Sequence, residues 1–119
     1  MTLWLGIMLI GGIGSVSRFM VDRAVARRAA RSFPFGTFTV NITGAVLLGL
    51  ITGLALNHQA ALLAGTAFVG AYTTFSTWMF ETQRLTEERR VGPAAANLAV
   101  SVVLGIAAAA AGQALAGLL

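Results

Sequence analysis

Four long apolar segments dominate this 119-residue chain and limit what it can fold into. They cover residues 3–21, 35–56, 60–80 and 94–119, and short polar stretches separate them. Each is long enough to cross a hydrocarbon core of about 30 Å as a helix, which takes about 20 residues. Because a helix satisfies its own backbone hydrogen bonds in lipid, we expect an all-α protein with four transmembrane helices. Together they predict one transmembrane domain over residues 1–119.

The composition favours the same reading. Apolar residues make up 57% of the chain and charged residues only 10%, whereas soluble domains carry about 25% charged residues. A soluble domain of this composition would have too little polar surface to cover its core. Residues 1–17 contain no basic residue and three more apolar segments follow, so we do not expect a cleaved secretory signal. The chain is predicted to be a multi-pass membrane protein.

The residue types that enzymes need are scarce. The chain has no cysteine, which excludes disulfides, thiolate nucleophiles and cysteine-bound metals. Its single histidine, His58, lies in a short polar stretch between two apolar segments, where we expect a loop. These features predict that the protein is not an enzyme. Its eight basic residues, all arginine, would suggest nucleic acid in a soluble protein, but in a membrane protein they first indicate topology.

All the arginines fall on one side of the predicted fold. They occur near the end of the first segment and in the first and third connections: Arg18, Arg23, Arg27, Arg28, Arg31, Arg84, Arg89 and Arg90. With four crossings, the first and third connections lie on the same side of the membrane. The positive-inside rule places that side in the cytoplasm and both termini outside.

Polar and small residues inside the second segment indicate where helices pack or open. Gly49 and Gly53 form a GxxxG pair, a spacing that lets helix backbones approach closely. Asn41 is a polar residue in the same segment, and polar side chains in hydrocarbon normally face the bundle interior or a wet path. Its amide offers two N–H donors and no charge that would repel an anion. A hydrogen bond between helices is an equally open interpretation of Asn41.

The third segment contains the strongest local signal, residues 70–78 (GAYTTFSTW). A glycine followed by β-branched and hydroxylated residues disfavours helix, so we expect the third helix to be broken in mid-membrane. A break frees backbone carbonyls, which can coordinate cations. Phe75 and Trp78 share one helix face beyond the break. Their positively polarised ring edges can favour an anion, although packing against lipid or another helix would give the same spacing.

No Asp or Glu lies in the middle of any segment, and Arg18 and Glu81 lie near segment ends. Uncharged donors and aromatic edges therefore favour passive conduction of an anion. One alternative is a small proton-coupled multidrug transporter, which would need a carboxylate in the first segment, and residues 3–17 contain none. The other is a non-conducting subunit of a membrane assembly, which would explain the glycines but not the break.

Three motifs resemble the Fluc (CrcB) family of fluoride channels. They are residues 11–19 (GGIGSVSRF), residues 33–37 with 40–44 (FPFGT and VNITG), and residues 70–78 followed by Glu81. Their order and spacing match the family, and the resemblance covers essentially the whole chain. It implies a passive, fluoride-selective channel of the inner (plasma) membrane that exports fluoride and lowers its toxicity in the cytoplasm.

The resemblance also implies an antiparallel, dual-topology homodimer with fluoride pores at its interface. The implied pore residues are Asn41, Phe75, Trp78, Thr74, Ser76, Thr77, Ser101 and Glu81, with Arg18 in a vestibule. Backbone carbonyls of Gly70 and Thr73 would hold a structural Na⁺ at the dimer centre.

Two features of this chain depart from the family pattern. Trp78 occupies a position that is usually phenylalanine; its ring edge and its N–H can still face an anion, while its bulk narrows the path. The one-sided arginines conflict with the small orientational bias expected of a dual-topology protein. We retain dual topology as the prediction.

Overall fold

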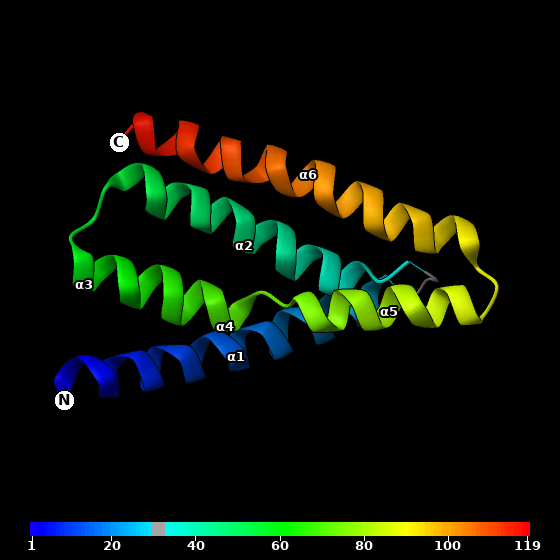
Figure 1. Ribbon diagram of the computed structural model, residues 1–119, viewed down its shortest axis with the longest axis horizontal. Helices are drawn as coiled ribbons and strands as arrows, with labels where there is room; N and C mark the ends of the chain where they lie inside the picture. Colours follow the sequence, from blue (N-terminus) through cyan, green and yellow to red (C-terminus); the bar gives the residue numbers. More distant parts are fainter. Residues whose placement is uncertain (30–32) are drawn as a thin grey trace.

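The computed structural model describes residues 1–29 and 33–119, and these residues form helices and no strand. The helices are α1 (Thr2–Arg28), α2 (Phe35–Leu54), α3 (His58–Ala61), the π-helix η1 (Leu62–Val69), α4 (Gly70–Tyr72), α5 (Phe75–Glu87) and α6 (Val91–Gly117). Helices α3, η1 and α4 follow one another without a gap and form a single rod (Figure 1). The prediction of an all-α protein is confirmed.

Three helices, α1, α2 and α6, are each long and apolar enough to cross a membrane. Large apolar side chains on α1 face outward along its length, including Trp4, Met8, Ile13 and Phe19. Exposed apolar surface of this extent is unfavourable in water and is what a helix in contact with lipid requires. The remaining apolar stretch is divided among the shorter helices α3 to α5.

The helices extend beyond the predicted segments at the basic end. Helix α1 continues to Arg28 instead of ending near residue 21, and α6 begins at Val91 instead of residue 94. Hydropathy marks only the part of a helix that suits hydrocarbon. Arginine and alanine are good helix formers, so α1 continues into the polar region.

Both described arginine-rich regions lie at one end of the molecule. The end of α1 and the turn between α5 and α6 share one end of the long axis, whereas the two termini and the turn between α2 and α3 share the other (Figure 1). The arrangement agrees with the predicted sidedness of the arginines. Arg31, which belongs to the same set, lies outside the described residues.

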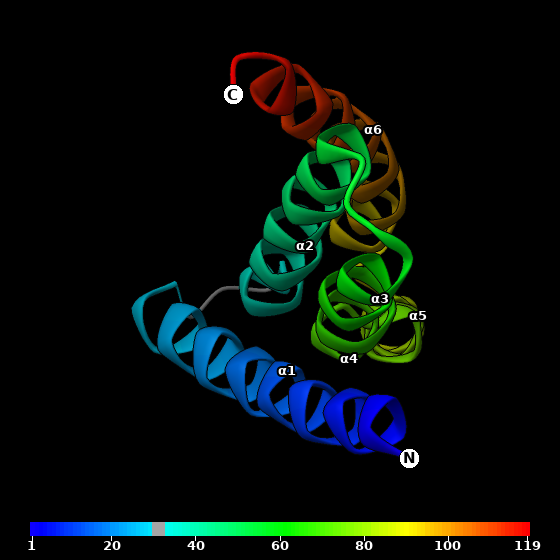
Figure 2. The same ribbon diagram turned by 90° about the vertical axis from the view of Figure 1, so that its left-hand side faces the viewer.

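Helices α2 and α6 pack closely because glycines form the contact. A methyl group added at Gly49 would overlap the backbone of Ala109, and one added at Gly112 would overlap the carbonyl of Val46. At Gly53 the nearest atom would be the Ala116 methyl group, 2.6 Å away. The predicted GxxxG packing face is confirmed, and α6 is the helix that occupies it. Helix α1 lies on the opposite side of α2 from α6 (Figure 2).

Candidate functional site

The rod of α3, η1 and α4 stops at Tyr72, and α5 begins at Phe75. Between them Thr73 and Thr74 are extended, with φ and ψ of −81° and 161° at Thr73 and −147° and 119° at Thr74. Threonine is branched at Cβ, which restricts χ1 and lowers its preference for helix. The same branching raises its preference for extended backbone. The chain therefore changes from helix to strand-like geometry for two residues and then returns to helix.

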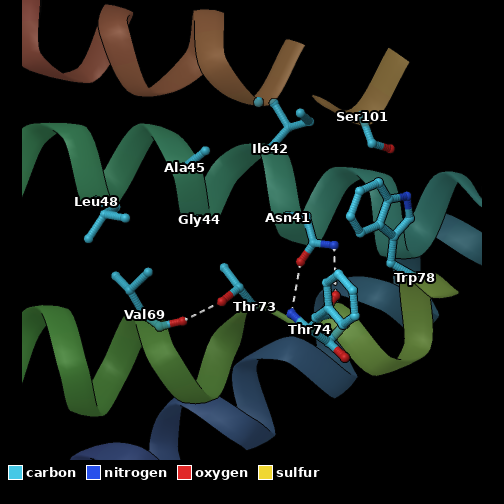
Figure 3. A pocket seen from close by; sticks show the side chains of 12 residues that line it. Asn41, Ile42, Gly44, Ala45, Leu48, Val69, Thr73, Thr74, Trp78 and Ser101 are labelled. Carbon is cyan, nitrogen blue, oxygen red and sulfur yellow. Dashed lines mark hydrogen bonds between the residues drawn. The ribbon is translucent and has the colours of Figure 1, made fainter. Parts of the chain in front are cut away.

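Asn41 on α2 replaces the backbone partners that Thr74 loses at this interruption. The Asn41 side-chain N–H donates to the Thr74 carbonyl at 2.9 Å, and the Thr74 N–H donates to Asn41 Oδ1 at 2.8 Å (Figure 3). An extended residue needs such a pair because a buried, unpaired peptide group is costly. Gly44, one turn further along α2, lets Thr73 approach, since an added Cβ there would overlap Thr73 Cγ2.

The interruption also diverts two N–H groups from helical hydrogen bonds. In a continuous helix the carbonyls of Gly70 and Thr73 would accept from the N–H groups of Thr74 and Thr77. The Thr74 N–H donates instead to Asn41 Oδ1, and the Thr77 N–H donates to Thr74 Oγ1 at 3.2 Å as the cap of α5. The carbonyls of Gly70 and Thr73, which were predicted to hold Na⁺, thereby lose their helical donors.

A cleft of about 290 Å³ opens beside the interruption, between α2, α5 and α6. Its polar lining comes from Asn41, Thr73, Thr74 and Ser101, and none of the charged residues that the structure describes lines it (Figure 3). The Asn41 amide nitrogen carries a second hydrogen that has no partner among the described residues. Ser101 Oγ is buried and likewise has no hydrogen-bond partner in the described part of the chain. The cleft thus offers neutral donors.

Two aromatic rings line the same cleft. Phe75 and Trp78 meet edge to face, with ring centroids 5.7 Å apart and planes at 82°. Phe75 remains 70% exposed although it lines the cleft. The Trp78 indole N–H donates to the carbonyl of Asn97 on α6 at 2.9 Å. This N–H, which from the sequence could still face an anion, is therefore already bound to the backbone of α6.

A second, smaller cleft of about 140 Å³ lies between α1, α2 and α5. Arg18, Asp22, Thr37 and Thr77 line it, and Thr74 lines both clefts. The predicted vestibule residue Arg18 thus lines a different cleft from Asn41 and Phe75, and Thr74 is common to the two clefts.

The remaining predicted residues lie on α5 beyond the interruption. The hydroxyl oxygen of Ser76, an exposed residue, is 3.5 Å from that of Thr74. Glu81 is half-buried near Thr37, Asp22 and Arg84. Its Oε1 atom is buried and has no hydrogen-bond partner in the described part of the chain. Neither Ser76 nor Glu81 lines either cleft.

Sequence reasoning missed the importance of Asn97. This side chain is fully buried and bonds Thr82 on α5. A signal was available, because Asn97 is the only asparagine in an alanine-rich segment and lies one helical turn before Ser101. The spacing of residues in this segment did not show which helix the Asn97 side chain would contact.

Comparison with known families decides where this architecture belongs. The family described as "CrcB-like protein, Camphor Resistance (CrcB)" matches residues 5–113. The chain belongs to the CrcB family. All three sequence motifs and both clefts lie within the matched region.

Proteins named as fluoride-specific ion channels are similar to this chain over most of their length. The chain is 72% identical over 111 residues to fluoride-specific ion channel FluC 2 of Mycobacterium tuberculosis, covering 93% of this chain and 88% of that protein. It is 70% identical over 115 residues to FluC 2 of Mycolicibacterium paratuberculosis, covering 97% and 94%. It is 40% identical over 118 residues to FluC 1 of Leifsonia xyli, covering 96% and 86%. Together with α1, α2 and α6, these similarities establish a membrane protein.

Proposed function

We propose that this chain is a passive, fluoride-selective ion channel of the plasma membrane and not an enzyme. The observation that carries the proposal is the uncharged cleft beside Thr73 and Thr74, where amide and hydroxyl donors meet two aromatic rings. The names of the relatives, all fluoride-specific ion channels, support the same ion.

The lining of the cleft suits a small anion that gives up its water. Fluoride is strongly hydrated, so a pore must replace water with other hydrogen-bond donors. The free N–H of Asn41 and the hydroxyl of Ser101 can do this, and donors act more strongly at the low dielectric of a protein interior. The aromatic edges add positive polarisation without a fixed charge that would trap the ion.

The remaining polar residues extend this path in our proposal. Thr74, Ser76 and Thr77 supply hydroxyls along α5 in the direction of Glu81, while Arg18 attracts anions into the second cleft. Transport needs no coupled energy source, because a membrane potential that is negative inside drives an anion outward by about 2.3 kcal/mol per 100 mV. The result is export of fluoride and protection of the cytoplasm.

We further propose that two chains pair in opposite orientations to complete the pores. The support comes from Phe75, which lines the cleft yet is 70% exposed in a single chain. A conducting path needs walls on all sides, and a second copy can supply the missing one. Each chain then contributes one four-helix transmembrane domain, with α3 to α5 together acting as its third crossing.

A structural Na⁺ fits the interruption in this arrangement. The carbonyls of Gly70 and Thr73 have lost their helical donors, and unwound carbonyls of this kind suit Na⁺. Two chains would supply four oxygens, and the cation would offset the cost of burying an anion. Replacing Na⁺ with N-methylglucamine should lower the dimer fraction measured by light scattering. An unchanged dimer fraction would argue against the site.

The function is tested by fluoride efflux from liposomes containing the purified protein, measured with an ion-selective electrode. We expect rapid fluoride efflux and little chloride efflux. Phe75→Ile should reduce fluoride efflux by at least about tenfold, because it removes an aromatic edge from the path. Phe80→Ile is the matched control, since Phe80 is exposed on α5 outside the cleft. Equal fluoride and chloride efflux would refute the proposal.

A further inference from the structure

Three residues join α5 and α6 through a closed ring of hydrogen bonds. The Trp78 indole N–H donates to the backbone carbonyl of Asn97 at 2.9 Å. The Asn97 side-chain N–H donates to Thr82 Oγ1 at 2.8 Å, and the Thr82 hydroxyl donates to the backbone carbonyl of Trp78 at 2.9 Å. The Asn97 amide also makes a longer contact, 3.4 Å, with the Trp78 carbonyl. Each helix therefore holds the other through both a side chain and its backbone.

The ring is built in a dry environment. Asn97 has no exposed surface and Thr82 is only 9% exposed. A buried polar group costs free energy when it is left unpaired, and bonds in a closed network reinforce one another. An aliphatic residue at position 97 would leave the Thr82 oxygen without its N–H donor. The N–H side of the Asn97 amide is therefore matched to the α5 face that carries Trp78, whereas its Oδ1 atom is buried and has no hydrogen-bond partner in the described part of the chain.

The ring of hydrogen bonds fixes which edge of the Trp78 indole faces the cleft. The Trp78 N–H is bound to α6, while the indole ring of Trp78 lines the cleft and meets the Phe75 ring edge to face. Figure 3 shows the six-membered part of the indole on the side of the Asn41 amide and the ring nitrogen on the other side. The cleft thus meets C–H groups of Trp78 and not its N–H.

We infer that Asn97 is a positioning residue that makes Trp78 present a C–H edge to the permeating anion. The inference rests on the proposed channel function and adds a role for α6. If the Asn97 amide is lost, the backbone carbonyl that accepts the indole N–H remains, but Thr82 Oγ1 and the Trp78 carbonyl lose their N–H donor and α5 is no longer held against α6 on this side. The indole can then move away from that carbonyl, so that its N–H enters the path as a strong donor or its bulk closes the path. Asn97 acts through Trp78 and does not contact the anion.

Nuclear magnetic resonance tests the hydrogen bond directly. Trp4 and Trp78 are the only tryptophans, so Trp4→Phe leaves a single indole N–H to observe in ¹⁵N-labelled protein in micelles. We expect Asn97→Ala to speed exchange of the Trp78 N–H with deuterium by at least about tenfold, since the part-buried bond to the Asn97 carbonyl weakens once the amide no longer holds α5 against α6. Gln113→Ala, which removes an exposed amide from the same helix, should leave the exchange rate unchanged. Unchanged exchange in Asn97→Ala would overturn the inference.

A double-mutant cycle on fluoride efflux tests the consequence for transport. In the parent chain we expect Asn97→Ala to lower efflux at least about tenfold, and in a Trp78→Phe background by less than about threefold, since phenylalanine has no N–H to hold. Equal losses in both backgrounds would show that Asn97 acts independently of the indole. Thr82→Val breaks the ring from α5 and should show the same dependence on Trp78. It provides a second route if Asn97→Ala does not yield folded protein.

The two experiments separate this inference from the proposed function. If the parent chain conducts no fluoride, the channel proposal fails while the exchange measurement still reports on the ring. If the parent conducts fluoride and the efflux losses are equal in both backgrounds, only the positioning role fails.

Discussion

At the scale of single residues, Asn41 shows how a side chain can substitute for backbone. Its amide presents one donor and one acceptor to Thr74, as a neighbouring strand would. The two interpretations that the sequence left open for Asn41 are therefore compatible. One N–H holds the interruption together, while the other has no partner among the described residues and lies beside the cleft.

Replacing Asn41 with aspartate tests this structural role. Aspartate keeps the acceptor for the Thr74 N–H but turns the donor into an oxygen facing the Thr74 carbonyl. We expect the free energy of unfolding, measured by detergent titration, to fall by about 1–3 kcal/mol, the cost of an unsatisfied buried group. Asn57→Asp is the matched control, because Asn57 only accepts a bond, from the Ala60 N–H at a helix start, and aspartate does this equally well. Equal stability of the two variants would contradict the role given to Asn41.

At the scale of helices, the most extensive contact in the described chain pairs α2 with α6, and glycines form part of it. The backbone of each helix fills the space where the other lacks a side chain, at Gly49 and at Gly112. Packing of this kind replaces the hydrophobic drive that lipid does not provide. It also holds Asn41 and Ser101, which come from these two helices, on opposite walls of one cleft.

The contact predicts different effects for two glycines of α6. Gly112→Ala should destabilise the fold by about 1–3 kcal/mol, because the new methyl group forces the Val46 carbonyl away. Gly117→Ala should be neutral or slightly stabilising, since no atom lies within 4 Å of the added methyl group and alanine favours helix. Unfolding of both variants in mixed micelles measures the difference. A neutral Gly112→Ala would mean that α2 and α6 are not in close contact.

Much of this architecture could be read from the sequence because hydropathy and glycine spacing act locally. The apolar segments located α1, α2 and α6, and the GxxxG pair located the face of α2 that meets α6. The residues around Thr73 and Thr74 disfavour helix by their own propensities, and the interruption lies there.

Other features depend on contacts between segments distant in sequence and were not predictable from local pattern. The bond between Trp78 and Asn97 joins residues 19 apart on different helices, so residue spacing did not show that α6 binds the indole N–H. The π-helical geometry of Leu62–Val69 likewise has no sequence signal that we recognised. Arg18 and Asn41 lie in different clefts and Thr74 lines both, an arrangement that depends on how the helices pack and that residue spacing does not encode.

At the scale of the whole molecule, the unequal distribution of arginines bears on the direction in which the chain inserts into the membrane. The described arginines are concentrated toward one end of the bundle, at the end of α1 and the turn after α5 (Figure 1). A single chain with this bias would insert in one direction. The proposed antiparallel pair requires both directions, so orientation in the membrane is a direct test of the assembly.

Single-cysteine variants can measure orientation because the native chain has no cysteine. His58→Cys places a thiol at one end of the bundle and Thr86→Cys at the other. With dual topology, a membrane-impermeant maleimide added outside intact cells should label about half of each variant. Labelling of one variant completely and the other not at all would show a single orientation and exclude the antiparallel pair.

The basic end of the bundle has a further consequence for an antiparallel pair. Such a pair has a two-fold axis in the plane of the bilayer, so both aqueous faces would carry the same collar of guanidinium groups. Anionic headgroups in either leaflet would meet it, and ions would enter equally well from either bath. Current through the assembly should therefore show no rectification when the voltage is reversed in symmetrical solutions.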